Sequence, residues 1–358
     1  MPFNPKRLGI ARKLRMLNKT AFAQMVGVTD RTLLRWDQGT TVPTEETVEA
    51  CAKALGFPQA FFFGDDLEEP NLDTTSFRSQ SSMTAATRDA VIASGALGFV
   101  VSDWVESRFD LPKCKVPSLQ FAPDPETASR MLREEWLLGE IPITNMIHLL
   151  ESKGVRVFSL AETTATINAY AHWHNERPFV FLNSYKSAEC ARFDAAHELG
   201  HLVLHRDGKN TGRQAEDQAH AFASSFLMPK ADVLSVFRRK SVQSLREIIE
   251  HKVRWKVSVG ALAHRIHKLD LISDWKYREF CIEIARKGYR TKEPNGIGRE
   301  KSVVWDKVIK MLWSEKTTHT DIANDLSIPV AEVAELLLAF LMYQRSSAVS
   351  PLRCQYFQ

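Results

Sequence analysis

Apolar residues recur at helical spacing between residues 187 and 204, and this is the clearest pattern in the chain. The segment contains no proline. Ser187 is placed to cap its first turn, and Glu189 follows where the helix dipole favours an acidic side chain. The pattern predicts a half-buried helix over residues 187–204. The recurring apolar positions are Cys190, Phe193, Ala196, Leu199, Leu202 and Val203.

A second amphipathic segment covers residues 216–228 and ends at Pro229, because proline cannot continue a helix. On a wheel of about 100° per residue, Glu216 lies roughly 70° from the centre of the apolar stripe and Asp217 roughly 170° from it. Glu216 is therefore expected at the edge of a buried face, and Asp217 in solvent. The stripe consists of Ala219, Phe222, Ala223 and Phe226.

Three short runs typical of strands precede these helices, at residues 155–158, 167–174 and 178–182. They predict a small sheet beside the helix of residues 187–204, with an edge to which an extended substrate can add as a strand. Tyr170, His172 and His174 in the middle run are candidates for stabilising an oxyanion. For each one singly, an ordinary strand position is the simpler interpretation.

The first sixty residues predict a compact helical domain. A short helix that includes Phe22 is broken at Gly27, and Thr29 caps a second helix that runs through Trp36 and ends at Gly39. Two short helices joined by a glycine turn form a helix-turn-helix. A further helix is expected from residue 44.

The remaining regions read as a linker and then as helices. Residues 66–80 are acidic and then rich in Pro, Thr and Ser, which predicts a linker. A helix over residues 84–109 has an apolar face that indicates packing or a homodimer contact rather than a cofactor site, and residues 126–153 predict two more helices. Residues 271–358 are mostly helical. Within them, residues 318–338 look like a second helix-turn-helix, with Ser327 capping its second helix; few of its residues are basic, so we expect it to contact protein.

The helix of residues 187–204 carries His197, Glu198 and His201 in the spacing H-E-x-x-H. Residues four apart lie on one helix face, about 6 Å apart along the axis. Two imidazoles at this spacing can bind one metal ion, and the carboxylate between them can act as a general base. The segment therefore predicts a hydrolytic metal centre.

A catalytic zinc site usually has three protein ligands. His205 is about 12 Å from His197 along the helix axis, too far to share an ion, so we expect it at the helix end, behind the ligands if it contributes at all. A carboxylate at the edge of a buried face needs a partner, which a metal supplies. Glu216 is thus the preferred third ligand and His220 the alternative.

Together these two segments resemble the ImmA/IrrE family of zinc metallopeptidases. H-E-L-G-H is followed by E-x-x-A-H-x-F-A-x-x-F-L-M-P, and the likeness covers roughly residues 116–270. The resemblance implies a zincin-like domain in which His197, His201 and Glu216 bind Zn²⁺ and Glu198 is catalytic. It also implies a protein substrate, typically a cognate repressor or antitoxin. The family more often has Asn or Asp at the position of His220.

The stretch of residues 22–39, ending R-W-D-Q-G, resembles the Cro/repressor-like (XRE) helix-turn-helix family over about residues 5–65. The resemblance implies a five-helix domain whose recognition helix reads base edges in the major groove. Arginine can pair with guanine, and aspartate can accept from cytosine. Such domains also serve as dimerisation or partner-binding modules. The residues expected at bases are Asp30, Arg31, Thr32 and Arg35, and those expected near phosphates are Lys19 and Gln38.

The composition of the chain says more about its cellular compartment than about its function. The chain has 358 residues, 44% of them hydrophobic and 25% charged, which is typical of a soluble protein of two or three domains. The net charge of +4 permits nucleic-acid binding without requiring it. Five scattered cysteines without a C-x-x-C favour free thiols in a reducing cytosol. The N-terminus lacks the apolar core of a signal peptide, and residues 91–101 are too short to span a bilayer, so we expect a cytoplasmic protein without membrane contact.

The sequence therefore predicts an α+β, predominantly helical chain in four parts. These are a helix-turn-helix domain at residues 1–66, a linker and connecting helix at 67–115, a metallopeptidase domain at 116–270 and a helical C-terminal region at 271–358. One hypothesis is a DNA-binding transcriptional regulator that also cleaves a partner protein with zinc. The other is a repressor or antitoxin without proteolysis, whose zincin-like fold is a sensor or scaffold. Glu198 favours the enzyme, because a structural metal site has no use for a carboxylate between its histidines.

Overall fold

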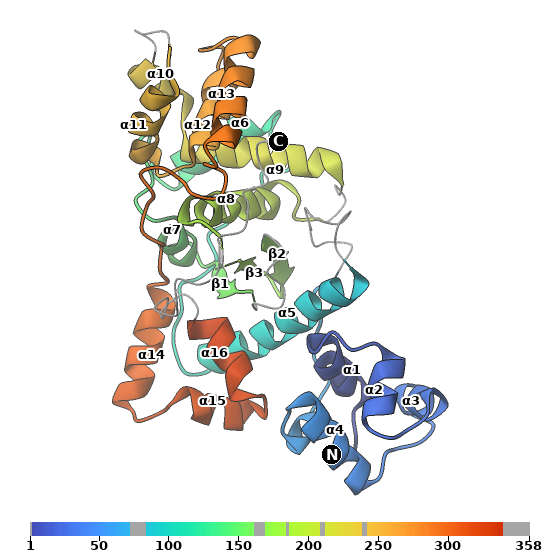
Figure 1. Cartoon of the computed structure of the whole chain (residues 1–358). Coiled ribbons are helices and arrows are strands. Elements are labelled where there is room, and N and C mark those ends of the chain that lie inside the picture. The colour runs from blue at the N-terminus through green and yellow to red at the C-terminus, as the bar shows by residue number, and fades with distance from the viewer. Residues whose placement is uncertain are drawn as a thin grey trace.

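The computed structural model describes residues 2–71, 84–160, 169–183, 186–207, 212–237 and 242–338. Over these ranges the chain is predominantly helical with one small sheet, which confirms the predicted fold class. Figure 1 shows the sheet between two long helices, with the N-terminal helices beyond one of them and a group of later helices beyond the other.

The sheet has three strands in the order β1-β3-β2. β1 (Arg156–Ser159) runs parallel to β3 (Arg177–Leu182), and β2 (Ala169–His174) runs antiparallel to it. The strands lie where the sequence predicts them, although residues 167 and 168 of the predicted middle strand lie outside the described residues. β2 is an edge strand of this sheet.

A two-residue turn joins β2 to β3. His174 pairs with Arg177, and the intervening Asn175 and Glu176 have positive φ angles of 48° and 60°. Positive φ at both turn residues matches the twist of the flanking strands and gives a tight hairpin.

The two faces of the sheet belong to two separate hydrophobic cores. Successive strand residues point to opposite faces, so Ala169 and Ala171 enter one core and Tyr170 enters the other. The first core includes α8, which lies against β2 and β3, and α9, which lies against α8. Its helices are α6 (Pro125–Glu135), α7 (Met146–Ser152), α8 (Ala188–Leu204), α9 (Arg213–Leu227), α10 (Lys230–Phe237), α11 (Leu245–Trp255), α12 (Val259–Lys268) and α13 (Asp274–Arg286).

The second core joins the opposite face of the sheet to α5 (Ala85–Glu106), to the N-terminal domain and to the C-terminal helices. α5 is long and apolar enough to cross a membrane by length and composition, but 67% of its apolar window is buried inside the molecule. It is therefore a core helix, and its apolar face packs within the chain. This agrees with the packing role predicted for residues 84–109.

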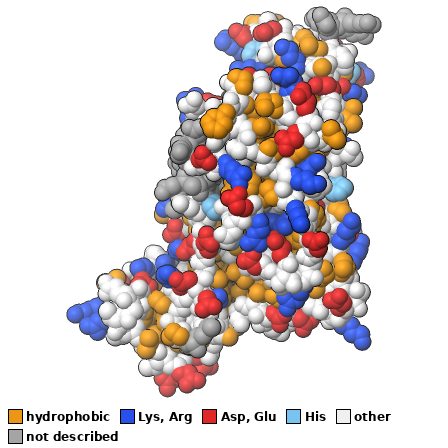
Figure 2. All heavy atoms as spheres, turned by 180° about the vertical axis from the view of Figure 1, so that it is seen from behind, with side chains coloured by type: hydrophobic (Ala, Val, Ile, Leu, Met, Phe, Trp, Pro, Cys, Tyr) orange, Lys and Arg blue, Asp and Glu red, His pale blue; other side chains and the backbone are white. Residues whose placement is uncertain are grey.

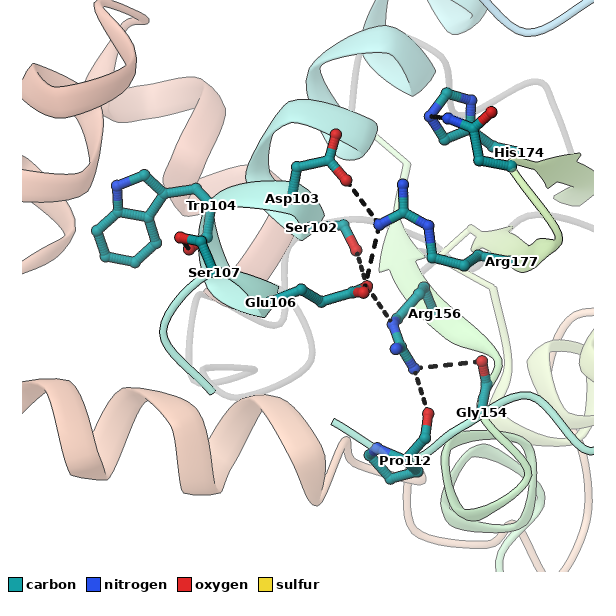
Figure 3. Close-up of polar contacts among 11 residues, drawn as sticks. Ser102, Asp103, Trp104, Glu106, Ser107, Pro112, Gly154, Arg156, His174 and Arg177 are labelled. Carbon is teal, nitrogen blue, oxygen red and sulfur yellow. Dashed lines mark hydrogen bonds and ion pairs between the residues drawn. The ribbon is translucent and has the colours of Figure 1, made fainter. Parts of the chain in front are cut away.

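Charged side chains fasten α5 to the sheet (Figure 3). Arg177 of β3 lies 2.6 Å from Asp103 and 3.3 Å from Glu106, and Arg156 of β1 donates to Glu106 at 2.8 Å. Arg156 also donates to the carbonyls of Pro112 and Gly154. α5 is thus fixed to both parallel strands.

The C-terminal helices α14 (Val304–Ser314), α15 (His319–Leu326) and α16 (Val330–Leu338) lie on the same side of the sheet as α5. α16 contacts β1 and α5 and buries Val333 and Leu336 there. The predicted second helix-turn-helix is thus packed on its own chain, and its contact with another protein stays a prediction. The prediction that Ser327 caps the second helix is wrong: Ser327 ends α15 in the left-handed conformation, with φ 53°.

The N-terminal domain contains the predicted helix-turn-helix. Asn18 and Thr29 cap its two helices, and Gly27, between them, has a φ of 72° that a glycine adopts without strain. α1 packs on α5, so the domain rests on the connecting helix. Its helices are α1 (Pro5–Leu14), α2 (Lys19–Met25), α3 (Asp30–Asp37), α4 (Glu45–Leu55) and the 3₁₀ helix η1 (Gln59–Phe63).

The expectation of free thiols holds for part of the chain. Cys51, Cys114 and Cys281 are free. Cys190 is in a disulfide, so the expectation is wrong for this residue.

Candidate metal centre

α8 and α9 lie against each other at close range because small residues face one another. Ser187 accepts a hydrogen bond from the Cys190 amide and caps α8, as predicted. One turn of α8 separates His197 from His201, and Gly200 lies between them in the sequence. A Cβ added at Gly200 would meet Ala219 of α9 at 3.2 Å, closer than ordinary contact. The missing side chain lets α9 approach the histidine pair.

α9 brings Glu216 to these histidines from its first turn. The Glu216 side chain is 19% exposed, whereas the neighbouring Asp217 is exposed, as the helical wheel predicts. The Nε2 atoms of His197 and His201 are 3.1 Å apart. Oε2 of Glu216 lies 3.2 Å from His197 Nε2, and its Oε1 lies 3.5 Å from His201 Nε2.

These separations can be compared with those of a tetrahedral zinc site. Zinc ligands lie roughly 2.0–2.2 Å from the ion, which places the ligand atoms of a tetrahedron about 3.3–3.6 Å apart. The Nε2–Nε2 separation of 3.1 Å is close to this range, and so are the distances of 3.2 and 3.5 Å from the histidines to the two carboxylate oxygens of Glu216. The residue types present, two imidazoles and one carboxylate, also match the donor set of a catalytic zinc centre. His197, His201 and Glu216 therefore fit a zinc ion.

Electrostatics keep Glu216 in the ionised form that a ligand requires. Burial opposes its ionisation, but hydrogen bonds and charge interactions with His197 and His201 outweigh burial and lower the pKa of its carboxyl. These three side chains converge where α8 and α9 meet, and a buried polar group is costly unless it is paired.

His205 lies behind His201 rather than among the donor atoms. Its Nδ1 is 3.0 Å from Nδ1 of His201, and its Nε2 is 2.9 Å from Oε1 of Gln218. An amide oxygen accepts only, so His205 donates from Nε2 and its Nδ1 accepts from His201. Nε2 of His201, on the other side of the ring, lies next to Glu216 and His197. Burial lowers the pKa of His205 to about 4, consistent with a neutral ring.

Glu198 is 3% exposed and follows His197 directly on α8. On a helical wheel Glu198 lies about 100° from His197 and roughly 60° from His201, because each residue turns the helix by about 100°. It thus borders the histidine pair without joining the close group of donor atoms, a position suited to a base rather than to a ligand.

Other residues considered from the sequence do not join this group. The ring of His220 packs against Phe193 and His264, at centroid distances of 5.1 and 5.4 Å. Among the described residues, the group of possible ligand atoms within 4.8 Å of one another comprises His197, His201 and Glu216.

The β2 residues considered for stabilising an oxyanion point away from α8 and the metal centre. His172 and His174 stack on Phe99 of α5, and the Tyr170 hydroxyl donates to the Val91 carbonyl. All three lie on the sheet face opposite α8, so the suggestion that one of them stabilises an oxyanion is wrong. The β2 side chain on the α8 side near the helix end is Trp173, which donates to the Leu202 carbonyl.

Sequence reasoning missed Gly200 and Gln218. A signal for Gly200 was available, because small residues at positions 196 and 200 of α8 and at 215 and 219 of α9 share the spacing of four that close helix packing uses. Nothing in the sequence identified Gln218, since its contact with His205 depends on how α8 and α9 are placed.

The recognition helix α3 presents polar side chains to solvent. Asp30, Arg31, Arg35 and Gln38 are exposed and Thr32 is partly buried. Lys19 forms an ion pair with Asp37 at 2.6 Å, and Thr20 donates to Asp30 at 2.9 Å. Figure 2 shows this domain projecting from the molecule, with Lys or Arg side chains at one outer corner and Asp or Glu side chains at its lower end.

The fold and the donor group define a class of protein, a helix-turn-helix domain joined to a metallopeptidase-type domain. Family models agree with this division. Residues 150–267 match the IrrE N-terminal-like domain of the peptidase M78 family, and residues 8–58 match a helix-turn-helix. The chain therefore carries both domains, in the order predicted. A comparison with curated proteins gives no match.

Proposed function

We propose that this protein is a DNA-binding regulator whose metallopeptidase domain hydrolyses a peptide bond in a partner protein. The observation that carries the proposal is the convergence of the His197, His201 and Glu216 donor atoms at zinc-like separations, with Glu198 beside them. The peptidase M78 match over residues 150–267 supports the same reaction class.

In this proposal His197, His201 and Glu216 hold Zn²⁺. When bound, the ion would supply Lewis-acid chemistry, which lowers the pKa of water and polarises a carbonyl group. Glu198 accepts the proton of the attacking water as the new C–O bond forms. It then gives that proton to the amide nitrogen as the C–N bond breaks. The imidazole and carboxylate donors suit zinc.

In this proposal the N-terminal domain binds DNA and so determines where the protein acts. We propose that Asp30, Arg31, Thr32 and Arg35 of α3 face base edges, with Lys19 and Gln38 near phosphates. The substrate would then be a protein that acts at the same operator or operon, such as a repressor or antitoxin. This proposal includes a cytoplasmic location, which a DNA target and the free thiols of Cys51, Cys114 and Cys281 favour.

The test separates metal binding from catalysis. Wild type, Glu198→Gln and Glu216→Ala are compared for zinc content by emission spectroscopy, and for cleavage of co-expressed proteins encoded nearby. We expect Glu198→Gln to keep zinc and lose cleavage by roughly 10²-fold or more, as for removal of a general base. Glu216→Ala should lose both. Asp217→Ala is the matched control, because its carboxylate is adjacent but exposed.

A pull-down with Glu198→Gln should retain the substrate uncut and identify it. Zinc bound by wild type without proteolysis of any partner would favour the sensor or scaffold alternative. Equal zinc binding by wild type and Glu216→Ala would remove the ligand assignment.

A further inference from the structure

A cavity of about 400 Å³ lies at the far end of α9 from the metal centre. It is lined by parts of α6, α9, α10 and α12, which Figure 1 shows gathered on the side of α8 away from the sheet. Ser225, which lines it, is nine residues from Glu216, or about 13 Å along α9. Its volume falls within the range of small-molecule sites, roughly 300–1,000 Å³.

Cations outnumber carboxylates in this cavity. Arg130, Arg133, Lys230 and Arg265 line it together with Glu126 and Glu140, so four positive groups face two negative ones. Arg265 is neutralised, because it donates to both oxygens of Glu126 at 2.8 and 3.1 Å. The remaining carboxylate, Glu140, is exposed.

Arg133 is the unusual member of the set. It is 3% exposed, and its guanidinium donates to the carbonyls of Gly139, Phe226 and Ile141 at 2.6–2.8 Å. Within the described ranges Arg133 forms no ion pair. The carboxylates of Glu140 and Asp232 interact with its charge electrostatically, but from beyond ion-pair distance. These three hydrogen bonds use three of the five N–H donors of the guanidinium and supply no counter-charge, and a buried charge without a counter-charge is costly.

Two further features extend the positive field. Lys230 opens α10, an eight-residue helix, and Ala231 follows it on the cavity wall. Both are exposed at the rim. The N-terminus of a helix carries partial positive charge and free N–H groups, which favour an anion. Leu234 and Pro229 add apolar surface beside them.

We infer that this cavity is a binding site for a small organic anion, with a phosphate or carboxylate group at Arg133 and Lys230 and an apolar part on Leu234. The site is separate from the metal centre and does not depend on the proposed proteolysis. A guanidinium fork pairs with either kind of anion, so the test has one arm for each.

The experiment uses the full-length protein and two probes, inorganic phosphate and citrate, titrated at constant ionic strength with chloride as the balancing anion. Calorimetry and thermal unfolding measure binding. We expect saturable binding of one probe with a rise in Tm. Lys230→Glu and Ala231→Glu should each weaken it by about tenfold or more, because each puts a negative charge at the rim. Acidic residues are favoured in a first helical turn, so both variants should fold.

Lys307→Glu is the matched control for Lys230→Glu, since it makes the same change of net charge at an exposed position of α14. It should bind the probe as wild type does. The inference is overturned if neither probe binds saturably, or if binding is unchanged by Lys230→Glu and Ala231→Glu. It is also overturned if Lys307→Glu weakens binding equally, which would show a response to net charge alone.

Discussion

Gly200 of α8 lies so close to Ala219 of α9 that a Cβ at position 200 would be 3.2 Å from the Ala219 Cα and 3.1 Å from the Phe222 ring. The distance between the two helices sets whether Glu216 reaches the histidine pair. A side chain at position 200 must push α9 outward or displace Phe222 in the core.

Gly200→Val should therefore weaken zinc binding although it touches no donor atom. We expect overpacking to cost about 1–3 kcal/mol of unfolding free energy and zinc affinity to fall with it. Zinc competition with a chelator and thermal unfolding measure the two effects. Ala221→Val, at an exposed position of α9, is the control. Undiminished zinc affinity in Gly200→Val would mean that the close approach does not position Glu216.

Gln218→Leu should lower zinc affinity indirectly, because Gln218 contacts His205 and His205 contacts the ligand His201. Without the amide oxygen, Nε2 of His205 loses its acceptor, and the hydrogen bond that orients His201 weakens. Loss of such outer partners typically costs about 10–100-fold in metal affinity. The control is Gln214→Leu, on an exposed part of α9. If both variants bind zinc like wild type, His205 does not orient His201.

Glu293 should make stability depend on pH. Its carboxyl shares Lys252 with Glu189 at 3.3 and 3.2 Å. Burial, reinforced by Glu189 and opposed by Lys252, raises the pKa of Glu293 to about 7. The unfolded pKa is about 4.3. Between these values the folded state binds more protons than the unfolded state, so this group's contribution falls as pH rises from about 4.3 to 7.

Glu293→Gln should remove that contribution. The difference in unfolding free energy between wild type and variant, measured by urea titration from pH 4.5 to 7.5, should then change with pH. Glu315→Gln, at an exposed position on the end of α14, should follow wild type at every pH. A difference between wild type and Glu293→Gln that is constant across this range would contradict the assignment.

Arg31→Ala and Arg35→Ala should each weaken binding to a DNA site selected in vitro by about 1–3 kcal/mol and relax its sequence preference. Both guanidinium groups are exposed on the recognition helix. Lys19→Ala should weaken binding to all sequences more evenly, and less, because Asp37 already pairs with that ammonium. Gel shifts at two salt concentrations measure both effects. Wild-type affinity in both arginine variants would remove the base-reading assignment.

The sequence by itself determined the features that depend on residues close together along the chain. Helical repeats fixed the side on which His197 and His201 lie, since residues four apart share a face in any α-helix. The same periodicity separated Glu216 from Asp217, and the glycine turn and Thr29 located the helix-turn-helix. These features need no knowledge of what packs against them.

Contacts between distant segments were decided only by the tertiary structure. Period-two alternation put Tyr170, His172 and His174 on one face of β2, but which face meets α8 depends on the packing of two cores around the sheet. The burial of α16 against β1 and the contact of Gln218 with His205 have the same origin. Local propensity describes each element alone, whereas the free energy that places one element against another comes from shape, apolar burial and paired charges across the interface.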